Sequence, residues 1–229
     1  MPVFLRHALL WPVVLLLVLT TAVPVVAQSS DASMSIARVK YGGGGDWYSD
    51  EQSLPELLSF VRQNTLLDVA LDADVVELTS DKLFSFPYIY LTGHGNVDFS
   101  PAEVERLRQY LLGGGFLHVD DNYGLDEHIR RELEKVFPQR PLEELPFDHL
   151  IYNARYAFPE GLPKIHEHDG DAPQGFGIRD DNGRVMVFYT YESDLGDGWE
   201  PASVHNNDEE KRRAALRMGA NILTYAMTH

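Results

Sequence analysis

The residues best suited to chemistry follow two short apolar segments of this chain, Tyr88–Leu91 and Phe116–Val119. The polar side chains at or near these two segment ends are His94, Asn96, His118, Asp120 and Asp121. Imidazole and carboxylate groups act as general acids and bases, and together they suit Zn, Mn or Fe. In an open α/β sheet, ligands bind outside the carboxyl ends of the strands. We therefore expect a ligand site where these two segments end.

Each of these residues also has a purely structural interpretation. Side chains alternate along a strand, so His118 and Asp120 share one face while Asp121 points to the other. A histidine inside a parallel strand is buried and needs a hydrogen-bond partner, which Asp120 or a neighbouring strand supplies. Asp121 with Asn122 fits a turn or a helix cap, and His94, between two glycines, fits an exposed turn. The sequence leaves both interpretations open.

Further histidines and carboxylates occur in the second half of the chain. Asp148 and His149 are adjacent, and His166 and His168 are separated by one residue. These spacings match no metal signature, and we predict a solvated loop around the latter pair. The acidic segment 194–200 contains a tryptophan and does not fit the ligand pattern of a calcium-binding EF-hand. We interpret it as a functional loop with an aromatic anchor.

The motifs of several large enzyme classes are missing from the sequence. The chain has no cysteine, so a cysteine nucleophile is excluded. It also has no Gly-x-Ser-x-Gly elbow, no phosphate-binding P-loop, no three-glycine dinucleotide motif and no HExxH zinc motif. What remains for chemistry is the set of histidines and carboxylates.

The chain is strongly acidic. It has 229 residues, with 35 Asp and Glu against 19 Lys and Arg, and a formal net charge of -16 at pH 7. Nucleic acid and anionic lipid both need a basic surface, so neither is expected as a partner. The absence of cysteine also means no disulfide and no lipid anchor attached through that residue. The acidity favours solubility, cations or basic partners.

The N-terminus has the order of a secretory signal peptide. Arg6 and His7 precede the apolar run Ala8–Leu19, and the Val-Val-Ala sequence at 25–27 supplies small residues for cleavage. The predicted parts of the chain are a signal peptide at 1–27, a flexible leader at 28–34 and a single α/β domain at 35–229. We expect a soluble protein in the periplasm or outside the cell. An uncleaved membrane anchor is the alternative.

The domain is predicted to alternate strands and helices. The expected strands are 35–41, 67–71, 75–78, 88–91, 116–119, 175–178 and 184–190, with an Asp-Asn-Gly hairpin turn before the last. The expected helices are one capped by Ser53, one at 101–112 behind the capping box Ser100-x-x-Glu103, and two at 126–137 and 208–227. Strand, helix and strand within about thirty residues form a βαβ unit with parallel strands. We predict an α/β three-layer sandwich with a mostly parallel sheet and a C-terminal hairpin.

Four segments of the chain occur in an order that resembles one bacterial family. They are PYIYLTGHGNVDFSPAEVERLRQYLLGGGFLHVDD, VFP, LPFDHLIY and DLGDGWE. Together they resemble the family known as domain of unknown function 4159, over nearly the whole mature chain. The resemblance implies a flavodoxin-like fold similar to class I glutamine amidotransferases, and envelope partners of the MoxR-type ATPase and von Willebrand A-domain systems. Amidotransferase chemistry of the usual kind is excluded because it needs a cysteine.

The leading functional hypothesis is a ligand- or protein-binding module of the cell envelope. Its site would be lined by His94, Asn96, His118, Asp120, Asp121, Asp148 and His149. The alternative is a metal-dependent hydrolase, in which a divalent metal would be bound by His94, Asp120 and Asp121 and the base would be His118 or His149. A purely structural partner in a von Willebrand A-domain complex is the third hypothesis.

Overall fold

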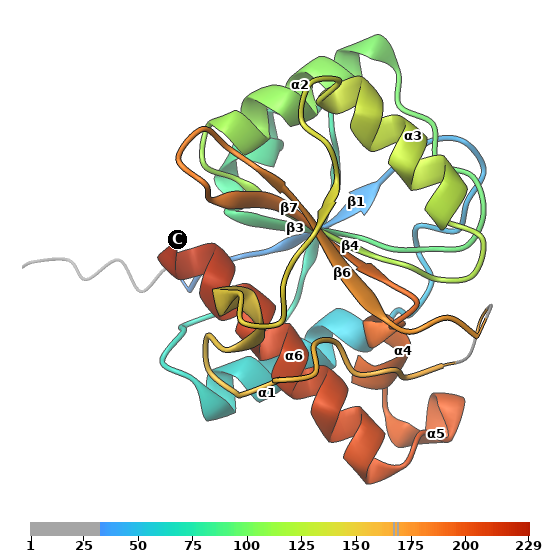
Figure 1. The fold of residues 1–229 in the computed structure, drawn as a ribbon, viewed down its shortest axis with the longest axis vertical. Helices are drawn as coiled ribbons and strands as arrows, with labels where there is room; N and C mark the ends of the chain where they lie inside the picture. The colour runs from blue at the N-terminus through green and yellow to red at the C-terminus, as the bar shows by residue number, and fades with distance from the viewer. Residues whose placement is uncertain (1–32, 167, 169) are drawn as a thin grey trace, which may run out of the picture. The chain divides into compact units, whose positions relative to one another are not determined.

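The computed structural model describes residues 33–166, 168 and 170–229 (Figure 1). Ser33–His229 form one compact unit. The predicted signal peptide and most of the predicted leader lie outside the described residues. Met34 pairs with Val69 in an isolated parallel bridge, so the end of the segment predicted as leader belongs to the domain.

A seven-stranded mixed sheet forms the centre of this unit (Figure 1). Its strands, in spatial order, are β2 (Asp74–Glu77), β1 (Ala37–Lys40), β3 (Tyr88–Leu91), β4 (Phe116–Asp120), β7 (Val185–Tyr191), β6 (Gln174–Arg179) and β5 (Glu143–Glu144). The first five are parallel, and β6 and β5 complete the sheet as antiparallel strands. The carboxyl ends of the parallel strands therefore share one edge, which is where open α/β sheets bind ligands.

Helices cover both faces of the sheet (Figure 1). One face carries α2 (Pro101–Leu112) and α3 (Asp126–Val136), and the other carries α1 (Ser53–Asn64), α4 (Leu195–Trp199) and α6 (Glu209–Thr228). Each face has its own core because alternate residues of a strand point to opposite sides. On β4, Leu117 and Val119 join the core under α2 and α3, whereas Phe116 joins the core under α1 and α6. The α/β prediction is confirmed.

Two local signals of the sequence are confirmed by the structure. At the start of α2, Ser100 Oγ accepts a hydrogen bond from Glu103 N at 3.3 Å, and Glu103 Oε2 accepts one from Ser100 N at 2.8 Å. Pro101 occupies the first turn, where its missing N–H leaves no donor unpaired. The Asp-Asn-Gly turn joins β6 to β7, and Gly183 adopts a φ of 85° that favours glycine.

Other local predictions are wrong. Ser53 does not cap α1 but is its first residue, and its buried Oγ accepts a hydrogen bond from Arg38 Nη2 at 3.2 Å. The segment 67–71 forms no strand beyond the bridge at Val69, and the Leu71 side chain is exposed. The acidic segment expected to be a loop contains α4.

Several short elements complete the described part of the chain. They are the 3₁₀ helices η1 (Asp81–Ser85) and η2 (Leu150–Tyr152) and the one-turn helix α5 (Ala202–His205). Within the residues that the structure describes, no helix combines the length and apolar character needed to cross a membrane.

Candidate functional site

Asp120, the last residue of β4, anchors helix α4 to the carboxyl edge of the sheet. The donors to its carboxylate are Thr190 Oγ1 (2.5 Å) and Leu195 N (3.2 Å) at Oδ1, and Gly196 N (2.6 Å) and Tyr90 Oη (3.1 Å) at Oδ2. Two of these donors are the first backbone amides of α4. Burial raises the pKa of Asp120 to about 7, although the bonds from Thr190 and from the two amides act to lower it. Asp120 therefore positions the segment that follows β7.

A chain of hydrogen bonds leads from the core to Asp120. Tyr88 Oη lies 2.8 Å from His118 Nδ1, and His118 Nε2 lies 3.1 Å from Thr190 Oγ1, which donates to Asp120. Burial lowers the pKa of His118 to about 3, so the ring is neutral. Burial also raises the pKa of Tyr88, whose hydroxyl therefore stays protonated and donates to Nδ1. His118 is thus a buried histidine with both nitrogens paired.

His166 faces two carboxylates with one ring nitrogen. Its Nδ1 lies 3.1 Å from Asp194 Oδ2 and 2.6 Å from Asp197 Oδ2. Its Nε2 lies 3.2 Å from Asn207 Oδ1, and Asn207 Nδ2 donates to Asp197 O at 3.2 Å. The Nε2–H group therefore donates to Asn207, and in a neutral ring the lone pair of Nδ1 points at both carboxylates. A proton or a metal cation bound at Nδ1 makes the contact between this nitrogen and the two carboxylates favourable.

His205 approaches the same carboxylate and completes a first cluster, formed by His166, Asp197 and His205. Its Nδ1 lies 3.3 Å from Asp197 Oδ2. One ligand atom from each of the three residues lies within 4.8 Å of the other two. Metal–ligand bonds of about 2.0–2.1 Å place neighbouring ligands of one ion roughly 3.0–3.4 Å apart. The 3.3 Å contact of His205 with Asp197 has this spacing, whereas the 2.6 Å contact of His166 with Asp197 is a direct ion pair that would have to lengthen around an ion. Two imidazoles and one carboxylate form a ligand set that suits zinc or iron.

A second cluster, formed by Asp121, His168 and Glu192, adjoins the first. Its ligand atoms also lie within 4.8 Å of one another. Asp121 directly follows β4 and Glu192 directly follows β7, so the pairing of these two strands brings the carboxylates together. His168 Nε2 lies 3.1 Å from Asp194 Oδ2, and Lys164 Nζ contacts the Glu192 carboxylate.

Four polar atoms of these clusters and of Asp194 are buried and have no hydrogen-bond partner among the described residues. They are Asp121 Oδ1, Asp194 Oδ1, His168 Nδ1 and His205 Nε2. Asp121 and Asp194 are each only 3% exposed. Buried polar groups are normally paired, because a missing partner costs about 1–3 kcal/mol. Their concentration at one place indicates a position for a bound ligand.

The electrostatics of the site are those of buried acids paired with histidines. Burial and the nearby Asp197 together raise the pKa of Asp50 to about 8. Burial acts to raise the pKa of Asp194 as well, but the hydrogen bonds from His166 and His168 lower it to about 2. The same contacts to Asp194 and Asp197 raise the pKa of His166 to about 10. Without a metal, the protonated ring of His166 therefore compensates these carboxylates, and a metal ion would have to replace that proton.

His94 and Asn96 lie on the loop after β3, at the same edge of the sheet. His94 Nδ1 lies 3.0 Å from Asp46 Oδ2, and Asn96 Nδ2 donates to Gly43 O at 2.9 Å. These contacts hold the loop against the glycine-rich segment that follows β1. Among the described residues, no hydrogen bond or ion pair joins either side chain to the two clusters.

Asp148 and His149 lie at the other edge of the sheet. Asp148 is exposed, and the His149 ring packs against Tyr225 with ring centroids 5.5 Å apart. Tyr225 Oη accepts a hydrogen bond from the backbone N of Val185, the first residue of β7. This pair therefore lies near the amino end of β7, whereas the clusters lie at its carboxyl end.

The residues that complete the clusters were not prominent in the sequence. His166 and His168 were expected in a solvated loop, but their side chains are only 29% and 9% exposed and face Asp194. Glu192 and His205 were missed, because no motif links them to the other members. Asp121, a predicted site residue, is a member of the second cluster, and the His-x-His pair and the acidic segment 194–200 are the further signals in the sequence that point here.

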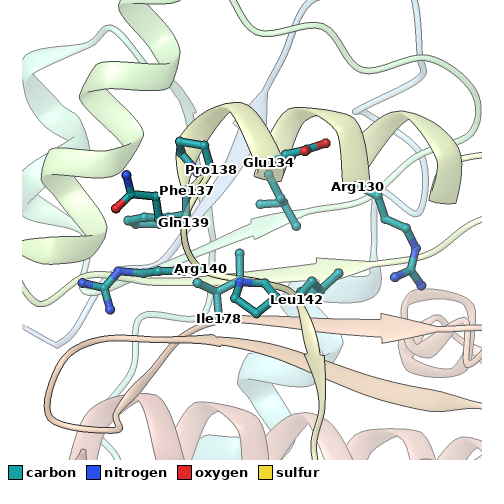
Figure 2. A pocket seen from close by; sticks show the side chains of 10 residues that line it. Arg130, Glu134, Phe137, Pro138, Gln139, Arg140, Leu142 and Ile178 are labelled. Atoms are coloured by element: carbon teal, nitrogen blue, oxygen red, sulfur yellow. The ribbon is translucent and has the colours of Figure 1, made fainter.

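A separate pocket of about 390 Å³ lies between α3 and the chain that follows it (Figure 2). Figure 2 shows Arg130 and Arg140 at its two ends, with Phe137, Leu142 and Ile178 between them. Its lining includes no histidine and no aspartate. We therefore place the candidate site at the two clusters and not in this pocket.

Comparison with known families agrees with the resemblance seen in the four sequence segments. Residues 35–227 match the family described as Domain of unknown function (DUF4159), and the chain belongs to that family. No curated protein matches the chain. The family description carries no activity, so a function has to be argued from the site.

Proposed function

For this member of the DUF4159 family, we propose a divalent-metal site formed by His166, Asp197 and His205 and used in metal-dependent hydrolysis. The observation that supports it most strongly is the position of His166 Nδ1, which faces two carboxylates while Nε2–H is engaged by Asn207. Three protein ligands leave coordination positions for water and substrate, as in catalytic zinc sites. A metal ion held there would supply Lewis acidity.

The surrounding residues are arranged to support such a site. Asn207 fixes which nitrogen of His166 is available, which is the role that outer hydrogen-bond partners play at metal sites. Asp120 fixes the start of α4 and therefore the position of Asp197. Asp50 lies beside Asp197 and accepts a hydrogen bond from Asn122 Nδ2 at 3.1 Å. A divalent cation bound at Asp197 would favour the ionised form of Asp50, and that carboxylate is our candidate for the group that would accept a proton from an attacking water.

The cellular setting is part of the proposal. The order of residues at the N-terminus supports export to the periplasm or the cell exterior. The family resemblance supports envelope partners from the MoxR-type ATPase and von Willebrand A-domain systems. Five parallel strands between two helical layers support a flavodoxin-like arrangement similar to class I glutamine amidotransferases. Amidotransferase chemistry is not proposed because the chain has no cysteine.

Metal analysis tests the proposal. Protein expressed from the full sequence without a histidine tag should retain at least one Zn, Mn or Fe ion per chain. His205→Gln should reduce that content, whereas the control His128→Gln on α3 should retain it. Wild-type protein that stays metal-free, with a melting temperature unchanged by added Zn or Mn, would contradict the proposal.

A ligand- or protein-binding module without catalysis is the second candidate function. The observation that favours it is an exposed aromatic surface after β1, where the Tyr48 side chain is 65% exposed. Two aromatic rings form this surface, since Trp47 and Tyr48 both line a pocket of about 510 Å³. Aromatic residues are enriched at interfaces. Co-purification of an envelope partner with wild-type protein but not with Tyr48→Ala would support this function.

A further inference from the structure

Asp194 connects the two clusters through a single carboxylate oxygen. Its Oδ2 lies 3.1 Å from His166 Nδ1 of the first cluster and 3.1 Å from His168 Nε2 of the second. Both distances fall within the roughly 3.0–3.4 Å expected between neighbouring ligands of one metal ion. Each imidazole nitrogen therefore contacts this oxygen at a hydrogen-bond distance that ligands of a common ion would also have, on both sides of one carboxylate.

The conformation of Asp194 is unusual and is held by the sheet edge. The residue has a φ of 58° and a ψ of 53°, in the left-handed region that costs roughly 1–2 kcal/mol for a residue with a Cβ atom. The amides of Leu195 and Gly196, bound to Asp120, hold the chain immediately after it. Asp194 Oδ1 is buried and has no hydrogen-bond partner among the described residues. Oδ2 thus contacts two imidazoles, whereas Oδ1 accepts no hydrogen bond from any described residue.

Carboxylates outnumber fixed cations around Asp194. The carboxylates of the two clusters and the bridge are Asp121, Glu192, Asp194 and Asp197, and Lys164 offsets one negative charge at Glu192. Without a metal, the protonated ring of His166 offsets another. A metal ion bound at Nδ1 would replace that proton, and the four carboxylates with one lysine would then carry about three negative charges, more than a single divalent ion neutralises.

We propose that the site holds two divalent cations, one in each cluster, with the Asp194 carboxylate as the bridging ligand. This inference rests on the proposed metal function and extends it to chemistry of the two-metal type. In such sites, ions about 3.5–4 Å apart stabilise both the attacking and the leaving oxygen of a hydrolysed substrate. The second cluster, with two carboxylates and one imidazole, suits Mn or Fe, since carboxylate ligands favour the harder ions.

Titration with Mn²⁺ tests the proposal. Calorimetry measures how many ions bind per chain, and electron paramagnetic resonance detects coupling between the bound ions. Untagged protein expressed from the full sequence should bind two Mn²⁺ per chain and show the spectrum of an exchange-coupled pair. Asp121→Asn and His168→Gln should each bind one ion without coupling. Asp194→Asn, which tolerates the left-handed backbone, should also lose the coupled spectrum. Asp74→Asn, on the exposed edge strand β2, is the matched control and should behave as wild type.

The outcomes separate the two proposals. The two-ion site would be overturned if the wild type bound one ion and if Asp121→Asn and His168→Gln still bound it while His205→Gln did not. That result would leave the proposal of the first metal site intact. Two ions without a coupled spectrum would overturn the bridging role of Asp194. No bound ion at all would overturn the proposed function itself. Melting curves of every variant check that each one is folded, and the two second-cluster variants act as independent tests.

Discussion

Asn207 and His166 fix each other's orientation. The amide NH₂ of Asn207 donates to the backbone oxygen of Asp197, so its Oδ1 is turned toward His166 Nε2. Histidine ligands of metals commonly donate their second ring N–H to such a partner, which sets the tautomer. The available nitrogen of His166 is therefore Nδ1, the atom that faces Asp194 and Asp197.

Replacing Asn207 with alanine should weaken metal binding without abolishing it. The ring of His166 would lose the acceptor that holds its tautomer, and loss of such partners costs about 10–100-fold in metal affinity. Competition titration with a chelating dye would measure the dissociation constant. Asn64→Ala, at the exposed end of α1, is the control. Equal affinities for both variants would show that Asn207 does not orient a ligand.

Asp120→Asn should destabilise the fold. Each carboxylate oxygen accepts from one backbone amide of α4, so either orientation of the new amide places an NH₂ group against the N–H of Leu195 or Gly196. Loss of a hydrogen bond that leaves a buried donor unpaired costs about 1–3 kcal/mol. Urea unfolding would measure the change, with Asp74→Asn as the exposed control. A change below about 0.5 kcal/mol, typical of surface substitutions, would contradict the anchoring role.

Gly196→Ala should displace α4 from the sheet edge. An added Cβ would lie 2.7 Å from Tyr90 Oη and 3.0 Å from Asp50 Oδ2, closer than normal contacts allow. Overpacking of this kind costs about 1–3 kcal/mol. At Gly42, by contrast, the nearest atom to an added Cβ is 3.4 Å away, an ordinary contact. We expect a lower melting temperature and weaker metal binding for Gly196→Ala only, and similar values for the two variants would argue against close packing at α4.

The buried His118 should make the protein less stable in mild acid. Its pKa is about 3 in the fold against 6.5 for an ordinary histidine. Between these two values the unfolded chain binds more protons than the folded chain, so stability falls as the pH falls below 6.5. At pH 5 the loss from this one group is about 2 kcal/mol relative to neutral pH.

Urea unfolding at pH 7.5 and pH 5 would measure that loss. His118→Gln should be less stable than wild type at pH 7.5, because it disturbs the contacts to Tyr88 and Thr190, but it should lose less stability on acidification. The same pH dependence in both proteins would mean that His118 is not held neutral by burial.

Elements with local signals and the strand end at Asp121 are predictable from the sequence, whereas the residues that complete the site are not. The capping box at Ser100 and the glycine turn at Gly183 act over a few residues, so the sequence reveals them directly. His166, in contrast, meets Asp194 across 28 positions and Asn207 across 41. The five residues of α4 are too few for a helical period, and their position depends on Asp120 in a distant strand.

Anomalous diffraction from crystals grown with Mn²⁺ or Zn²⁺ tests the metal site most directly. We predict a peak about 2.0–2.2 Å from His166 Nδ1, His205 Nδ1 and an oxygen of Asp197. A map without a peak at this position, with His166 Nδ1 still in direct contact with Asp194 and Asp197, would contradict it. The cluster would then be a network in which a protonated histidine, and not a metal, compensates the buried carboxylates.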